Sequence, residues 1–120
     1  MKTWAVVGLG NNPERAAFGV AKLLQDKGHR IIPVYPRAET VHGEVGYKTL
    51  SEIPGPVDVV DCFVNSTLVG KVVDEAIAIG AKAVWLQLDV IDKDAIARAQ
   101  AAGLVTVMDR CPAIEYRKKS

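Results

Sequence analysis

One pattern occurs three times along the chain: an amphipathic helical segment ends on a glycine, and an apolar run follows at once. The helical segments are predicted over residues 13–27, 67–79 and 93–102, because apolar residues recur there at i, i+3, i+4 and i+7. Gly28, Gly80 and Gly103 follow them, at the position where a positive φ commonly ends a helix. Helices that alternate with strands in this way predict right-handed crossovers and a parallel sheet.

The apolar runs predict five strands, at residues 4–8, 31–35, 57–63, 83–88 and 104–108. Most of these runs are continuous rather than alternating, which is typical of strands covered on both faces. We therefore predict an α/β, Rossmann-like three-layer sandwich around a five-stranded parallel sheet of order 3-2-1-4-5. The switch point then falls between the first and fourth strands. The length of 120 residues suits one domain, spanning 1–120.

Charge and composition limit the classes of partner. The formal net charge is only +1, which argues against nucleic-acid binding because that requires a clustered basic surface. No run is long enough for a membrane span, and the first residues do not form a signal peptide, so we expect no membrane partner and a cytoplasmic location. The two cysteines, Cys62 and Cys111, lie far apart without metal-type spacing and are expected to be free thiols.

The first strand is followed by a glycine-rich segment, Gly8-Leu9-Gly10-Asn11-Asn12. Asn12 is predicted as the N-cap of the first helix and Pro13 as its first residue. Free amides at such a turn and the positive helix end favour an anion. Arg15 in the first helical turn is expected to contact a phosphate, with a solvated arginine offset by Glu14 as the alternative.

The end of the second strand, Val34-Tyr35-Pro36-Arg37, differs from an NAD site. The third glycine of the dinucleotide fingerprint is replaced by Pro13, and no acid that would bind a ribose hydroxyl appears before Glu39. Arg37 instead suits a phosphate carried on the ribose, as in NADP or coenzyme A, or else is a solvated loop cation.

The later strand ends add further candidate residues. Asn65 is expected mainly to cap the second helix, with contact to the cleft as the alternative. Gln87 is a candidate hydrogen-bonding group for a ligand. Arg110 and Cys111 form a short polar turn after the fifth strand, and Cys111 is either a reactive thiol or an inert small hydrophobe.

Two acids are assigned structural roles. Asp61 lies inside an apolar strand, so its carboxylate is expected to be paired or hydrogen-bonded to a loop or an arginine. Asp92 is predicted as the N-cap of the third helix.

Several segments taken together carry a family resemblance. They are Trp4–Gly8, Asn12–Arg15, Ile32–Pro36, Tyr47–Pro54, Val57–Asp61, Ala76–Gln87 and Val107–Pro112. With them the chain resembles the small stand-alone CoA-binding proteins, which are similar to the N-terminal CoA-binding domain of the succinyl-CoA synthetase α subunit.

The resemblance implies a place for each part of coenzyme A. The loop from Gly8 to Arg15 would hold the diphosphate, and residues 34–37 would lie along the adenosine, with Lys48 as a further phosphate contact. The segments at Asn65, Gln87 and 109–112 would border the pantetheine arm. The sequence departs from the family pattern at Asn11, where serine is common, and at Tyr35, where asparagine is common.

These observations predict a non-catalytic module that binds coenzyme A or an acyl-CoA. Two alternatives stay open at this point: an NADP-binding oxidoreductase-like protein, and a redox sensor that uses Cys111. The sequence also leaves open a homodimer or a partner protein.

Overall fold

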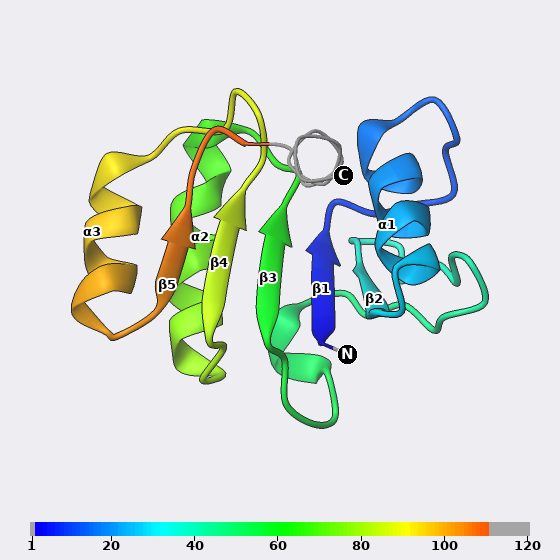
Figure 1. The fold of residues 1–120 in the computed structure, drawn as a ribbon, viewed down its shortest axis with the longest axis horizontal. Coiled ribbons are helices and arrows are strands. Elements are labelled where there is room, and N and C mark those ends of the chain that lie inside the picture. Colours follow the sequence, from blue (N-terminus) through cyan, green and yellow to red (C-terminus); the bar gives the residue numbers. More distant parts are fainter. Residues whose placement is uncertain (1, 111–120) are drawn as a thin grey trace.

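A computed structural model of the protein describes residues 2–110. Its strands are β1 (Thr3–Val7), β2 (Arg30–Val34), β3 (Val59–Cys62), β4 (Ala83–Leu86) and β5 (Val105–Val107), and its helices are α1 (Ala16–Asp26), α2 (Ser66–Ala78), α3 (Lys93–Ala101) and the short 3₁₀ helix η1 (Leu50–Glu52). Figure 1 shows β1, β3, β4 and β5 side by side with their carboxyl ends at one edge, and β2 pairs in parallel with β1. The α/β Rossmann-like class is therefore confirmed. No helix within residues 2–110 is long and apolar enough to cross a membrane.

The order of the strands differs from the prediction. All neighbours pair in parallel and the sheet runs β2-β1-β3-β4-β5, so the predicted order 3-2-1-4-5 is wrong. Val7 at the end of β1 is paired with Val34 of β2 on one side and with Cys62 of β3 on the other. The switch point consequently lies between β1 and β3, not between the first and fourth strands.

The connection between β2 and β3 gives the physical reason. A right-handed crossover places its connection on one face when the chain moves one way along the sheet, and on the opposite face when it moves back. The β1–β2 connection, α1, packs its buried residues on the face of Val6 and Ile31. The β2–β3 connection instead buries Leu50 on the face of Ala5 and Val60. The chain has therefore reversed direction, and β3 pairs with β1.

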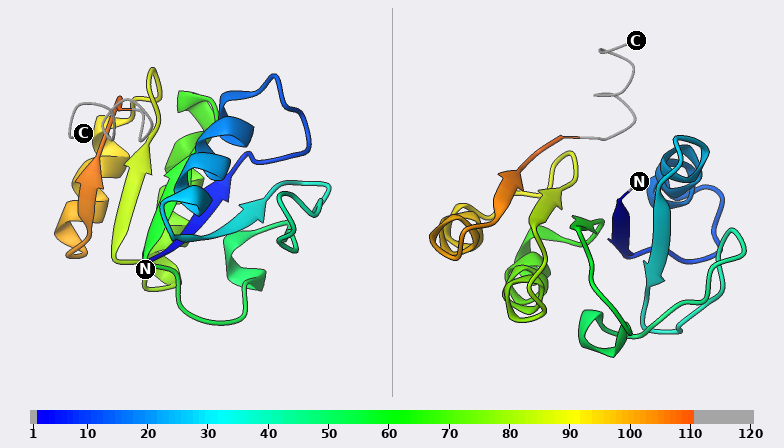
Figure 2. Two further views of the ribbon diagram at one scale, coloured as in Figure 1. Left: turned by 45° about the vertical axis from the view of Figure 1, so that its right-hand side comes forward. Right: turned by 60° about the horizontal axis from the view of Figure 1, so that its bottom comes forward.

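Two hydrophobic layers hold the three-layer sandwich together. Helix α1 buries Ala17, Val20, Ala21 and Leu24, the predicted apolar stripe, against one face of the sheet. Helices α2 and α3 bury residues such as Val73 and Ala99 against the other face. The two views of Figure 2 show α1 on one side of the sheet and α2 and α3 on the other.

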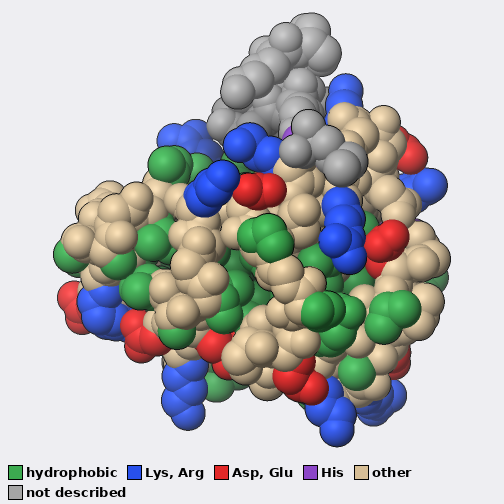
Figure 3. All heavy atoms as spheres, turned by 90° about the horizontal axis from the view of Figure 1, so that it is seen from below, with side chains coloured by type: hydrophobic (Ala, Val, Ile, Leu, Met, Phe, Trp, Pro, Cys, Tyr) green, Lys and Arg blue, Asp and Glu red, His purple; other side chains and the backbone are tan. Residues whose placement is uncertain are grey.

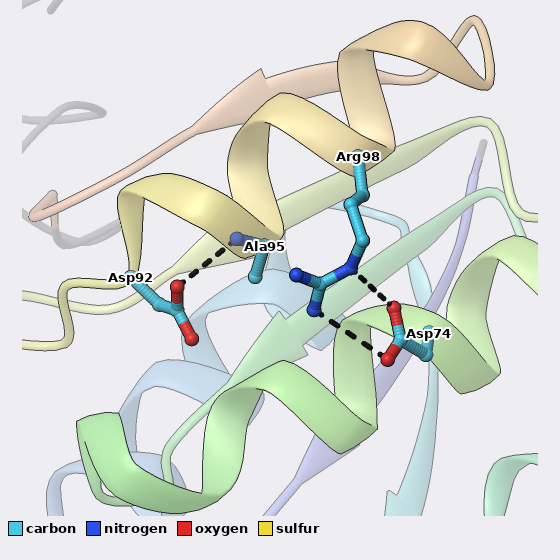
Figure 4. Close-up of polar contacts among 4 residues, drawn as sticks. All are labelled: Asp74, Asp92, Ala95 and Arg98. Atoms are coloured by element: carbon cyan, nitrogen blue, oxygen red, sulfur yellow. Dashed lines mark hydrogen bonds and ion pairs between the residues drawn. The ribbon is translucent and has the colours of Figure 1, made fainter.

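Helix α3 is fixed beside α2 by polar contacts (Figure 4). Asp92, the predicted N-cap, accepts a hydrogen bond from the backbone N–H of Ala95 at 3.0 Å. Arg98 of α3 donates from Nε to Asp74 of α2 at 2.9 Å. Gly70 allows this close approach, since a Cβ there would lie 3.2 Å from the Asp92 carboxylate.

Candidate functional site

A pocket of about 970 Å³ lies across the carboxyl ends of β1, β2, β3 and β4, at the observed switch point. Most of the site residues predicted from the sequence line it. They are Gly8, Gly10, Asn11, Asn12, Arg15, Val34, Tyr35, Pro36, Arg37, Lys48, Asn65 and Gln87. Topology thus gathers the ends of four strands around one cavity of a size typical for ligand sites.

Gly8 is required where β1 enters the loop. Its φ is +99°, and a Cβ would collide with the backbone carbonyl oxygen of Phe63, the residue that follows β3. Its N–H donates to the carbonyl of Val34 at 2.7 Å. Only glycine permits the loop to leave the sheet between the ends of β2 and β3.

The loop is longer than predicted at its far end. Helix α1 begins at Ala16, so the assignments of Asn12 as N-cap and Pro13 as first helical residue are wrong. The Asn12 side chain accepts from the N–H of Glu14 at 3.0 Å, and the Asn12 carbonyl accepts from the N–H of Arg15 at 3.0 Å. Asparagine here stabilises a local turn of its own, which competes with capping.

This later start leaves the amino end of α1 at the pocket. Arg15 is the residue at the cap position, and it makes no side-chain capping hydrogen bond. Ala16 and Ala17, in the first helical turn, line the cavity. Backbone amides at such a helix end, together with a glycine-rich loop, suit a phosphate group.

A second loop closes over the glycine-rich segment. The backbone N–H of Asn11 donates to Oε1 of Glu39 at 2.7 Å, and the Asn11 side-chain amide donates to the carbonyl of Thr40 at 2.6 Å. Gly10 permits this approach, because a Cβ there would lie 3.0 Å from the Glu39 carboxylate and 3.3 Å from the Tyr35 ring. The sequence analysis noted Glu39 only as the first acidic residue after the second strand and did not place it in the site.

The pocket carries an excess of positive charge. Arg15, Arg37, Lys48 and Lys71 line it, and all four are exposed. Among the described lining residues, Glu39 is the one carboxylate. The sequence analysis missed Lys71, which lies in α2 one helical turn beyond Thr67; that i+4 spacing from the helix start was the signal that could have found it.

The opposite edge of the sheet is different in character. Figure 3 looks at the molecule from below, and blue basic and red acidic side chains stand near one another around the rim of that face. There Lys82 pairs with Asp58 at 3.6 Å. The Asp58 carboxylate also accepts the N–H of Thr3, which holds the pKa of Asp58 below its usual value, with Lys82 adding to the effect. The unbalanced cations of the pocket are thus a local feature.

The β3–β4 side of the pocket is largely apolar. Leu68 and Val72 of α2 and Leu88 and Val90 after β4 line it. Asn65 occupies the N-cap position of α2 but makes no side-chain capping hydrogen bond, so the expected capping by its side chain is wrong; Asn65 is among the residues that line the cavity. The next residue, Ser66, accepts the backbone N–H of Ile91 at its Oγ at 2.9 Å, which ties the β4–α3 loop to α2.

Gln87 is the buried polar residue of this apolar side. It is 6% exposed, and its side-chain oxygen Oε1 has no hydrogen-bond partner among the residues described. Leaving a buried acceptor unpaired costs about 1–3 kcal/mol. A ligand that donates a hydrogen bond to this oxygen would remove that cost.

Two predicted site residues, Leu9 and Arg110, are not among the described residues that line the pocket. Leu9 is fully buried in the hydrophobic layer under α1, so it can reach a ligand only through its backbone. Arg110 follows β5, and its carbonyl accepts the indole N–H of Trp85 at 2.8 Å. Cys111 lies outside the described residues.

Asp61 is fully buried in β3, and neither of its carboxylate oxygens has a partner within residues 2–110. The expectation that it would be paired is therefore wrong. The neighbouring strands present Val6 and Trp85 to it, so nothing replaces the lost water, and burial raises the pKa of Asp61 well above its usual value. The adjacent Cys62 is buried in the core, and burial raises the pKa of its thiol as well.

Comparison with known proteins places this architecture in a family. The model of the CoA binding domain matches residues 2–117. An uncharacterized protein of Bacillus subtilis strain 168, YneT, is 34% identical over 110 residues, which are 92% of this chain and 82% of that protein. A hypothetical protein from Pyrococcus horikoshii OT3 of known structure has a TM-score of 0.93 and 38% identity, covering 98% of this chain and 82% of the other.

A larger protein shares the same region. The alpha subunit of acetate–CoA ligase (ADP-forming) II from Pyrococcus furiosus is 36% identical over 81 residues, which are 67% of this chain but only 18% of that subunit. The match thus covers a small part of the ligase subunit. From the family match and the relatives together, the chain belongs to the CoA-binding domain family.

Proposed function

We propose that this protein binds coenzyme A in the pocket at the switch point, with the diphosphate on the loop from Gly8 to Arg15. The observation that carries the proposal is that the glycine-rich loop, the amino end of α1 and four basic side chains lie around one cavity. Coenzyme A bears about four negative charges, on a diphosphate and a phosphomonoester. A pocket with one carboxylate and four basic side chains is complementary to such a ligand.

The two sides of the pocket match the two ends of the ligand. Val34, Tyr35 and Pro36 would lie along the adenosine, and Arg37 and Lys48, which line the same pocket, would bind the ribose phosphate. On the far side, Asn65 and Gln87 offer polar groups to the amides of the pantetheine arm. We also propose that the chain acts as a single cytoplasmic binding module rather than as an enzyme.

Isothermal titration calorimetry with the full chain tests this function. Coenzyme A is expected to bind more tightly than dephospho-coenzyme A, which lacks the ribose phosphate, and more tightly than NADPH, which has no pantetheine arm. Replacing Arg15 by Gln or Lys48 by Gln should weaken binding, whereas Lys22→Gln, on the exposed part of α1, should not.

Two results would overturn the proposal. Absence of both binding heat and thermal stabilisation at millimolar coenzyme A would exclude this ligand. Tighter binding of NADPH than of coenzyme A would favour the NADP alternative.

A further inference from the structure

Residues 35–40, which follow β2, form a short lid whose polar groups contact the glycine-rich loop. Oε1 of Glu39 accepts the backbone N–H of Asn11 at 2.7 Å, and the carbonyl oxygen of Thr40 accepts the side-chain amide of Asn11 at 2.6 Å. The lid therefore binds both donor groups of one loop residue. One of them is a backbone amide of the kind that holds a phosphate.

The lid also covers the neighbouring backbone of the loop. A Cβ on Gly10 would lie 3.0 Å from the Glu39 carboxylate and 3.3 Å from the ring of Tyr35, so both side chains rest against this glycine. Two anionic oxygens that share one N–H repel each other at short range. A phosphate and the Glu39 carboxylate consequently exclude each other at Asn11.

The chain beyond the lid is fixed to α1. Val41 is fully buried in the hydrophobic layer under this helix. Nε2 of His42 donates to the carbonyl oxygen of Phe18 at 2.8 Å, and Gln25 donates to the carbonyl oxygen of His42 at 3.0 Å. The lid itself has three exposed residues, Pro36, Arg37 and Thr40. It can therefore move while the segment after it stays in place.

The backbone of the lid is strained at Ala38. Its φ is +50°, in the left-handed region that alanine disfavours because of its Cβ. Its N–H donates to the carbonyl oxygen of Tyr35 at 2.8 Å, which closes a tight turn. The contacts of Glu39 and Thr40 with Asn11 offset this strain, so their loss favours movement of the lid.

We infer that the Glu39–Asn11 contact is the closed state of the lid, and that the ligand's diphosphate opens it by replacing the carboxylate at the Asn11 amide. This inference rests on the proposed function, because it requires a diphosphate at the first loop. Arg15 and Lys48, which line the same pocket, attract a phosphate and so favour the exchange. A fragment without phosphate, such as pantetheine, leaves the lid closed.

Calorimetric titration of the full chain with coenzyme A, at low and at high salt, tests the exchange. Glu39→Ala removes the competing acceptor and should tighten binding by about tenfold. Most of this gain should persist at high salt, because a direct hydrogen bond is screened much less than a long-range charge. Glu44→Ala is the matched control, since Glu44 lies after the lid and is not among the described residues that line the pocket.

Ala38→Gly tests the same lid without changing any charge. Glycine adopts a positive φ at little cost, so this variant stabilises the closed lid and should weaken coenzyme A binding by about fivefold. Ala102→Gly, at an exposed position after α3, is the matched control and should leave the dissociation constant unchanged.

The outcomes separate the two proposals. An unchanged affinity of Glu39→Ala or of Ala38→Gly would overturn the lid inference and leave coenzyme A binding standing. Weaker binding by Glu39→Ala, or a gain that disappears at high salt, would also overturn it, because the carboxylate would then support the loop or act only by repulsion. Failure of the unmodified chain to bind coenzyme A would instead overturn the proposed function.

Discussion

Oε1 of Glu39 accepts a hydrogen bond from the backbone N–H of Asn11 at 2.7 Å, so a carboxylate of the protein occupies an amide of the glycine-rich loop. This amide belongs to the group proposed to bind the diphosphate. Glu39 is also the one carboxylate among the described residues that line a pocket with four cations. The Glu39 carboxylate therefore places a negative charge of the protein close to the position proposed for the negatively charged diphosphate of the ligand.

Replacing Glu39 by Gln should tighten the binding of coenzyme A. Glutamine keeps the shape and an acceptor oxygen but removes the charge that repels the phosphates. We expect an affinity about threefold to tenfold higher in calorimetric titrations at low salt, with a smaller gain at high salt. Glu44→Gln, the same change in the same loop but outside the pocket, is the control. Weaker binding by Glu39→Gln would mean that the carboxylate holds the loop in its binding conformation instead.

Replacing Lys71 by Gln should weaken coenzyme A binding, although sequence reasoning did not find this residue. Lys71 lines the cavity from α2, whereas the glycine-rich loop follows β1. Because the side chain is exposed, we expect a loss of about threefold to tenfold rather than more. Lys93→Gln, on an exposed position of α3, removes the same charge away from the pocket and should leave the dissociation constant unchanged.

Asp61 should make the protein less stable as the pH rises. Burial raises the pKa of this carboxyl in the folded protein, so between the unfolded and folded pKa values the folded state binds more protons than the unfolded state. Its contribution is therefore most favourable below the ordinary value near 3.8 and is lost as the pH increases through the range above it. Asp61→Asn, which has no titrating group, should show a smaller loss of stability between pH 5 and pH 8 in urea unfolding.

The variant Asp61→Val tests how much the two unpaired carboxylate oxygens of Asp61 reduce the free energy of unfolding. Valine fits a strand and places no acceptor in the apolar layer. We expect the free energy of unfolding at pH 7 to rise by about 1–3 kcal/mol. A decrease would show that the Asp61 oxygens have a hydrogen-bond partner after all.

The two polar contacts of Figure 4 should differ in their effect on stability. Asp92→Ala removes the N-cap of α3 and should lower the free energy of unfolding by about 1 kcal/mol. Asp74→Asn weakens the ion pair with Arg98, whose side chains are 56% and 47% exposed, and should cost only a few tenths of a kcal/mol because solvent screens it. Urea unfolding of both variants measures the two losses in free energy of unfolding. A loss for Asp74→Asn equal to or larger than that for Asp92→Ala would contradict this ranking.

The sequence by itself predicted the main helices and strands and most of the residues that line the pocket. The apolar stripes and the glycines that end the helices depend on contacts within a few residues, and Gly28, Gly80 and Gly103 all have positive φ as expected. The residues after the first two strands line the pocket as predicted, because ligand sites of parallel sheets lie at the carboxyl ends of strands. The capping role of Asp92 could also be predicted, because the cap involves only the backbone N–H of Ala95, three residues further along the chain.

Only the tertiary structure decided how these pieces meet. The position of β3 beside β1 depends on which face of the sheet the connection with Leu50 covers, and no local pattern records that choice. The contact of Glu39 with Asn11 joins residues 28 positions apart, and Lys71 enters the pocket because α2 packs beside the switch point. Strand order and long-range contacts are set by packing between segments distant in sequence, whereas helix ends and turns are set by neighbours along the chain.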